Sequence, residues 1–170
     1  MGLTPLEGLF MGTRSGDLDP AILQFICNKE NLSIDEMLNI LNKKSGVLGL
    51  SEISSDFRDL GEAANSGNEQ AKTTLEAYSY RVAKYIGSYV AALNGTDAIV
   101  FTAGVGENNI EVREMIGKYL GYLSTGIDSE KNKVRGEEAI ISPDGAKVPI
   151  LVVPTNEELA IARETERLVK

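Results

Sequence analysis

The sequence predicts an α/β fold from three observations. Ala98 to Phe101 is an unbroken apolar run, typical of a buried strand, and Gly104 and Gly106 follow it before a helix start. Residues 69–93 repeat apolar side chains at intervals of three and four, which is the spacing of an amphipathic helix. Strand and helix patterns alternate in the second half of the chain, and this alternation favours helices packed on a sheet.

The predicted elements follow in order along the chain. Helices are expected at residues 20–29, 33–43, 55–65, 69–93, 109–120 and 155–168, and strands at residues 97–102, 138–142 and 148–153. Pro143-Asp144-Gly145 predicts a turn that makes the last two strands neighbours. Residues 46–53 are apolar but interrupted by glycine, which predicts a turn or a short strand. No linker or repeat divides the chain, so we expect residues 1–170 to form a single domain.

Composition disfavours several classes of function. The net charge of -8 disfavours nucleic acid or an anionic membrane surface as a partner. No apolar run approaches the roughly 20 residues of a membrane span, and the N-terminal residues lack a signal-peptide pattern. Cys27 is the only cysteine, which excludes an intrachain disulfide and favours a reducing compartment, so we expect a cytoplasmic protein. The chain contains no histidine, which excludes Ser-His-Asp hydrolysis and His-ligated metals within it.

Two glycine-containing segments are candidates for binding phosphate. In residues 104–108 (Gly-Val-Gly-Glu-Asn), glycines between a strand and a helix leave backbone N–H groups free to bind an anion. The alternative is an ordinary turn in which Asn108 caps the next helix, with Glu111 as its capping-box partner. In residues 12–16, Arg14 lies between two glycines, where its guanidinium suits bidentate binding of phosphate or carboxylate. The alternative is a surface loop with a local Arg14–Asp17 pair.

A third segment places a carboxylate, an aromatic ring and a guanidinium side by side, at Asp56, Phe57 and Arg58. This set suits the hydroxyl groups of a ribose and the ring of an adenine. The alternative is that Ser55 caps the following helix while Asp56 interacts favourably with the helix dipole.

A fourth segment, residues 154–159, follows a predicted buried strand. Thr155 and Glu158 have capping-box spacing, which leaves Glu157 free. A carboxylate at this position can bind Mg2+ beside phosphates, usually through water. The alternative is a surface glutamate that favours the helix dipole.

Together these segments resemble the acetate kinase family. MGLTPLEGLFMGTRSGDLDP at residues 1–20, SSDFRD at 54–59, FTAGVGEN at 101–108 and PTNEEL at 154–159 resemble four family signatures, in family order and at compatible spacing. The resemblance covers nearly the whole chain and concerns the C-terminal part of the enzyme. It implies a ribonuclease-H-like lobe of the actin-like ATPase type, incomplete at its N-terminal strands. It also implies reversible phosphoryl transfer from ATP to acetate, giving acetyl phosphate and ADP, with Mg2+.

The resemblance implies a role for each candidate residue. Arg14 matches the arginine that stabilises the phosphoryl group in the transition state. The nucleoside-binding run is matched by Asp56, Phe57 and Arg58, and the loop against the adenosine and its phosphates by Gly104, Val105, Gly106, Glu107 and Asn108. Glu157 matches the Mg2+-associated glutamate, and Pro5 matches a proline that lines the pocket for the acetate methyl group.

The family's other catalytic groups precede the residues matched here. We therefore expect a partial domain without the N-terminal lobe, inactive alone, whose partners include that missing part and a second copy in a homodimer. Glu52 stands where a small residue is expected before the SSDFRD segment. Two alternatives stay open: a propionate or butyrate kinase of the same family, and a non-catalytic module for dimerisation or nucleotide binding.

Overall fold

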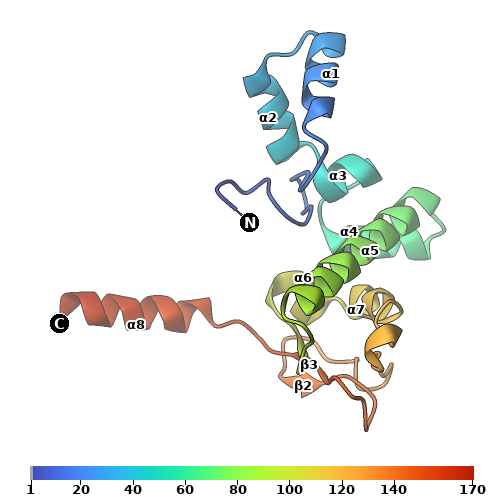
Figure 1. Cartoon of the computed structure of the whole chain (residues 1–170), viewed down its shortest axis with the longest axis vertical. Helices are drawn as coiled ribbons and strands as arrows, with labels where there is room; N and C mark the ends of the chain where they lie inside the picture. The colour runs from blue at the N-terminus through green and yellow to red at the C-terminus, as the bar shows by residue number, and fades with distance from the viewer. Residues whose placement is uncertain (1) are drawn as a thin grey trace. The chain divides into compact units, whose positions relative to one another are not determined.

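A computed structural model describes residues 2–170. The chain divides into two compact units, Met1–Ala92 and Leu93–Lys170. Figure 1 shows the backbone of both units. Each unit has buried apolar side chains of its own. That residues 1–170 act as a single partial domain stays a prediction.

The first unit is helical. It contains α1 (Ala21–Glu30), α2 (Ile34–Lys43), α3 (Gly46–Ser51), α4 (Phe57–Asn65) and α5 (Glu69–Ala92). At the start of α2, the Ser33 hydroxyl accepts the Glu36 N–H while the Glu36 carboxylate accepts the Ser33 N–H, a capping box. The helices expected near 20–29, 33–43, 55–65 and 69–93 are thus present, with ends displaced by up to two residues.

The prediction of a turn or strand at residues 46–53 is wrong, because these residues form α3. The first N–H groups of a helix have no partner inside it. Here the Val47 and Leu48 N–H groups donate to the carbonyls of Met11 and Gly12, at 2.9 and 2.8 Å. A contact with residues far away in the sequence therefore stabilises a helix that its own glycines disfavour.

The core of the first unit lies where α3 and α4 pack along α5. Leu60 of α4 and Ala71 and Leu75 of α5 are buried there. The apolar face predicted along α5 is buried in the first half of the helix, whereas Tyr89 near its end is 62% exposed. Packing within this unit therefore uses only part of the amphipathic face.

The second unit contains a three-stranded sheet in the order β1-β3-β2. β1 (Ile99–Phe101) pairs in parallel with β3 (Ile150–Val152), and β2 (Ala139–Ile140) pairs antiparallel with β3. The predicted neighbouring strands are thus confirmed, although shorter than expected. Alternate residues of β1 and β3 are buried on one face, as the two-residue period of a strand requires.

The remaining elements of the second unit are helical. They are α6 (Ala103–Asn108), α7 (Ile110–Gly117), a 3-10 turn (Gly121–Leu123) and α8 (Glu157–Val169). The helix expected at residues 109–120 is present as α7, although shorter, and α6 is an additional helix before it, so the Gly-Val-Gly segment is itself helical. Each residue of α8 is exposed. Within residues 2–170, no helix is long and apolar enough to cross a membrane.

Candidate functional site

Residues 11–16, which carry Arg14, form a loop held against α2 and α3. The Ser15 N–H donates to the Leu41 carbonyl at 2.9 Å, and the Ser45 N–H donates to the Thr13 carbonyl at 3.0 Å. The loop passes so close to Gly46 that a Cβ there would lie 2.1 Å from the Met11 carbonyl oxygen, and Gly46 has a φ of 62°. Only glycine fits this approach, so it fixes the backbone that carries Arg14.

The side chain of Arg14 is half-buried and does not pair with a carboxylate within residues 2–170. Its guanidinium lies 3.9 Å from the Met11 sulfur, and no ion pair of Arg14 is found within residues 2–170. The local Arg14–Asp17 pair is not formed, because Asp17 accepts hydrogen bonds from the Gly8 N–H at 2.7 Å and from the Tyr85 hydroxyl. These two bonds lower the pKa of Asp17, and the bond to Asp17 raises the pKa of Tyr85 to about 12. The charge of Arg14 is therefore not neutralised by a carboxylate within residues 2–170.

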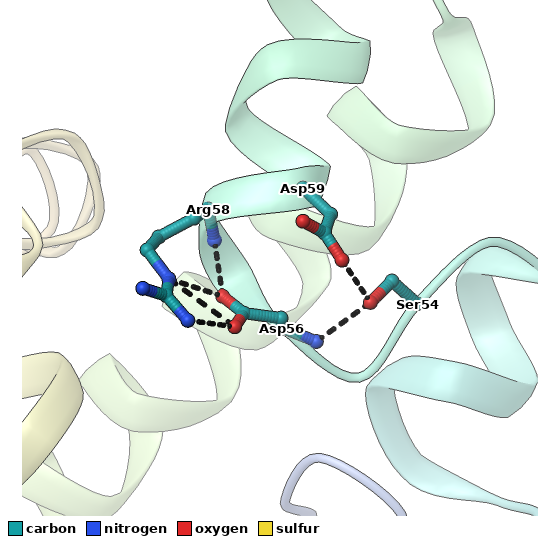
Figure 2. Close-up of polar contacts among 4 residues, drawn as sticks. All are labelled: Ser54, Asp56, Arg58 and Asp59. Carbon is teal, nitrogen blue, oxygen red and sulfur yellow. Dashed lines mark hydrogen bonds and ion pairs between the residues drawn. The ribbon is translucent and has the colours of Figure 1, made fainter.

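The Asp56 carboxylate forms the N-terminal cap of α4 (Figure 2). It accepts the Arg58 N–H at 2.8 Å and pairs with the Arg58 guanidinium at 2.6 Å. The Ser54 hydroxyl supports this turn, because it accepts the Asp56 N–H and donates to the Asp59 carboxylate. The expectation that Ser55 caps this helix is wrong, since the backbone reaches the cap position one residue later.

Phe57 connects this cap to the core of the first unit. Its ring packs edge-on against Tyr78 with the ring centres 4.7 Å apart, and Tyr78 packs against Phe10 at 5.5 Å. Phe57 remains half-buried. One part of the ring thus belongs to an aromatic cluster while another part is accessible to a ligand.

Arg58 is expected to keep Asp56 ionised in acid. Its hydrogen bonds lower the pKa of Asp56 from 3.8 to about 2. Because the pKa is lowered on folding, the stabilisation is complete above pH 3.8 and is lost as the pH falls towards 2. Both side chains are partly exposed, at 85% for Arg58 and 38% for Asp56, so solvent screening keeps this stabilisation small.

A carboxyl NMR titration measures this pKa directly. Arg58→Gln should return the pKa of Asp56 towards 3.8, whereas Arg167→Gln, in α8, should leave it unchanged. A wild-type Asp56 that titrates at the ordinary value would contradict the pairing.

The two glycines of α6 have different environments. A Cβ at Gly104 would meet nothing within 4 Å, whereas a Cβ at Gly106 would lie 3.3 Å from the Phe101 backbone. Gly104 therefore leaves backbone open to a ligand, and Gly106 lets the helix pack closely on β1. The cap assigned to Asn108 belongs to Asn109, whose side chain accepts the Val112 N–H at 2.9 Å.

The Glu107 carboxylate links α6 to the segment before α8. It is 9% exposed and accepts hydrogen bonds from the Thr155 N–H and hydroxyl, at 2.8 and 2.9 Å. These bonds, together with further ones from Ala103 and Thr102, lower the pKa of Glu107. The Thr155 hydroxyl is therefore not the helix cap predicted from sequence. Asn156 caps α8 instead, by accepting the Leu159 N–H at 2.9 Å.

A buried guanidinium fixes the other end of α6. Arg113 of α7 is fully buried, and each of its five N–H donors has an acceptor. Nη1 donates to the carbonyls of Gly106 and Glu107, both at 2.8 Å. Nε donates to the Asn132 side chain at 2.7 Å, and Nη2 donates to the carbonyls of Asn132 and Val134 at 2.9 and 2.8 Å. No acceptor is a carboxylate, and burial lowers the pKa of Arg113.

The two remaining candidates are exposed. Glu157 is the first residue of α8, and Pro5 lies in the loop before the first helix. No group of three or more acidic, cysteine or histidine residues that could hold a metal occurs in the described part of the chain. A metal held here would depend on Glu157 together with ligands from outside the chain, such as phosphate oxygens and water.

The predicted site residues are divided between the two units. Pro5, Arg14 and residues 56–58 belong to the first unit, whereas residues 104–108 and Glu157 belong to the second. Within the first unit the Arg14 loop reaches the Asp56 segment, because a Cβ on Gly12 would lie 3.3 Å from Ser55. Within the second, Glu107 contacts Thr155, two residues before Glu157.

Two features of the site were not predicted from the sequence: the buried position of Arg113 and the contact between Glu107 and Thr155. A signal for Arg113 exists, because it lies three residues from both Ile110 and Ile116 and so occupies the apolar stripe of α7. The Glu107–Thr155 contact spans 48 residues and has no local signal.

Solved structures with the same fold define the class of this protein. The acetate kinase of Porphyromonas gingivalis superimposes with a TM-score of 0.94 at 46% identity, over 100% of this chain and 43% of that one. A propionate kinase from Francisella tularensis superimposes at 0.89 and 44% identity, over 96% of this chain and 42% of that one. The chain therefore has the α/β fold of a ribonuclease-H-like, actin-like ATPase lobe.

Sequence comparison then identifies the family. The acetokinase family pattern matches residues 1–163, so the chain belongs to the acetokinase family. It is 63% identical to the acetate kinase of Lachnoclostridium phytofermentans over 169 residues, and 64% identical to that of Natranaerobius thermophilus. The match covers 99% of this chain but 43% and 42% of the two relatives.

Proposed function

We propose that this chain supplies the nucleotide-binding part of an acetate kinase, which transfers the γ-phosphoryl group of ATP to acetate. The observation that carries the proposal is that the Arg14 guanidinium has no carboxylate partner within residues 2–170. Its loop is held by hydrogen bonds to α2 and to the residues at the start of α3. A planar guanidinium binds two phosphate oxygens at once. Its charge counts most in the transition state, when negative charge spreads over the transferred group.

The other candidates fit roles in binding the nucleotide. Asp56, the accessible part of Phe57 and Arg58 suit the nucleoside, and the open backbone at Gly104 suits close approach of the adenosine and its phosphates. Val105, Gly106, Glu107 and Asn108 are the remaining residues of this segment in α6, and in our proposal Glu107 acts by holding α6 in place rather than by touching the nucleotide.

Mg2+ is part of the proposal through Glu157. A single exposed carboxylate fits Mg2+, which usually keeps several waters and binds one or two carboxylates plus substrate phosphates. When bound, the ion would neutralise charge on the phosphates. Pro5 is proposed to line the pocket for the acetate methyl group. A cytoplasmic location, a homodimer, and the absence of nucleic-acid and membrane partners stay predictions.

An activity assay tests the proposal. The chain is joined to the part of the Lachnoclostridium phytofermentans enzyme that lies outside the matched region, and acetyl phosphate is measured from ATP and acetate. We expect activity from the joined protein and none from the 170-residue chain alone. Turnover by the isolated chain would show that its own groups suffice, and an inactive but folded joined protein would contradict the proposal.

A propionate or butyrate kinase is the second candidate, because a propionate kinase shares the fold closely. Assaying acetate, propionate and butyrate with the same joined protein separates the two, although the added region contributes to the choice. The third, non-catalytic candidate predicts no nucleotide binding by the chain at millimolar concentration.

A further inference from the structure

An open cavity beside Arg14 is lined by two cations and no carboxylate. Its volume is about 420 Å3, and its lining comprises Thr13, Arg14, Leu38, Asn39, Asn42 and Lys43. Ligand pockets commonly measure about 300–1,000 Å3. The chain has a net charge of -8, whereas the two charged side chains that line this cavity are both positive.

Neither cation of this cavity is used in the folded chain. Within residues 2–170, the Arg14 guanidinium donates a side-chain hydrogen bond to the Met11 sulfur, and neither Arg14 nor Lys43 forms an ion pair. Four other lysines, Lys72, Lys131, Lys133 and Lys170, each pair with a nearby carboxylate, whereas Lys43 and its neighbour Lys44 do not within residues 2–170. The charges at this cavity are therefore available to a ligand.

The C-terminal end of α2 repels an anion less than a helix end whose last carbonyl groups lack hydrogen-bond partners. The last carbonyls of a helix carry partial negative charge when they lack partners. In α2 the Leu41 carbonyl accepts the Ser15 N–H and the Asn42 carbonyl accepts the Thr13 hydroxyl, both at 2.9 Å. The same loop that presents Arg14 thus covers these carbonyls.

We propose that this cavity binds a phosphate group, with Lys43 and Arg14 acting together on its oxygens. The ligand class is a phosphate or acyl-phosphate anion. Arg14 supplies a planar pair of donors, and Lys43 supplies a mobile point charge from the last turn of α2. This inference rests on the proposed role of Arg14, and it adds a residue outside the four signature segments to the phosphate site.

A phosphate titration of the 170-residue chain tests the inference. Inorganic phosphate is added at constant ionic strength to the nitrogen-15-labelled chain, and the amide signals of residues 11–15 and 39–43 are followed by NMR. We expect saturable shifts in both segments with one dissociation constant. Lys43→Gln and Arg14→Gln should each weaken binding about tenfold, since each removes a charged hydrogen-bond donor. Lys44→Gln is the matched control, because Lys44 is the next residue and does not line this cavity.

Three outcomes would overturn the inference: no saturable shift in the folded wild-type chain, an unchanged affinity in Lys43→Gln, or equal weakening in Lys44→Gln. A Mg-ADP titration of the same Lys43→Gln chain separates this failure from that of the proposed function. Suppose that Mg-ADP still shifts the amide signals of residues 56–58 and 104–108, while the affinity for phosphate is the same with and without Lys43. Then only the proposed role of Lys43 is wrong.

Discussion

Replacing Arg113 by methionine is expected to lower the free energy of unfolding by about 3–5 kcal/mol, a large part of the total of about 5–15 kcal/mol for a typical domain. The reason is that five acceptors lose their donors at once in a fully buried position. Methionine fills similar space but offers no N–H group. Urea unfolding of the 170-residue chain measures the change.

Lysine at position 113 gives a second test, in case the methionine variant does not fold. It keeps the charge but has three donors on one nitrogen, so it cannot replace a planar fork that reaches four backbone carbonyls and the Asn132 side chain. We expect Arg113→Lys to recover only a minor part of the lost stability. Lys118→Met, at an exposed position beside the end of α7, should stay within about 0.5 kcal/mol of wild type. An Arg113→Lys chain as stable as wild type would show that the five hydrogen bonds are not needed.

Replacing Arg14 by glutamine is expected to lower kcat of the joined enzyme by about 10³-fold or more, the range seen for arginines that contact a transferred phosphoryl group. The KM for ATP should change much less, because the guanidinium is proposed to act mainly in the transition state. Stability should change little, since the side chain has no carboxylate partner within residues 2–170. Steady-state kinetics and thermal melting of the same preparations separate these effects.

Arg14→Lys and Lys29→Gln serve as controls for this prediction. Lysine keeps the charge without the bidentate geometry and should recover part of kcat. Lys29 lies in the last turn of α1 and is exposed, so its replacement should leave kcat unchanged. If kcat of the Arg14→Gln enzyme stays within tenfold of wild type, Arg14 does not stabilise the transition state.

The sequence predicted elements whose signals are local. The spacing of apolar residues over 69–93 predicted α5, and the apolar run before Gly104 predicted β1. Glu52 shows why a small residue was expected at its position: it ends α3 with a φ of 56°, a left-handed conformation that favours glycine.

The features that could not be predicted depend on distant contacts. α3 forms because the loop at Met11 and Gly12 supplies acceptors for its first N–H groups. Thr155 has the spacing of a cap, but its hydroxyl is used by Glu107 from another part of the chain. The signature segments pointed to the candidate residues, whereas the groups that hold them, Arg113 above all, come from tertiary structure.

A Mg-ADP titration of the labelled 170-residue chain tests the central claim most directly, because the proposal assigns nucleotide contacts to one segment in each unit. The amide signals of residues 56–58 in the first unit and 104–108 in the second are followed together. The proposal predicts that both sets of signals shift saturably as Mg-ADP is added. A folded chain in which either set stays unshifted would contradict the nucleotide-binding role proposed for that segment.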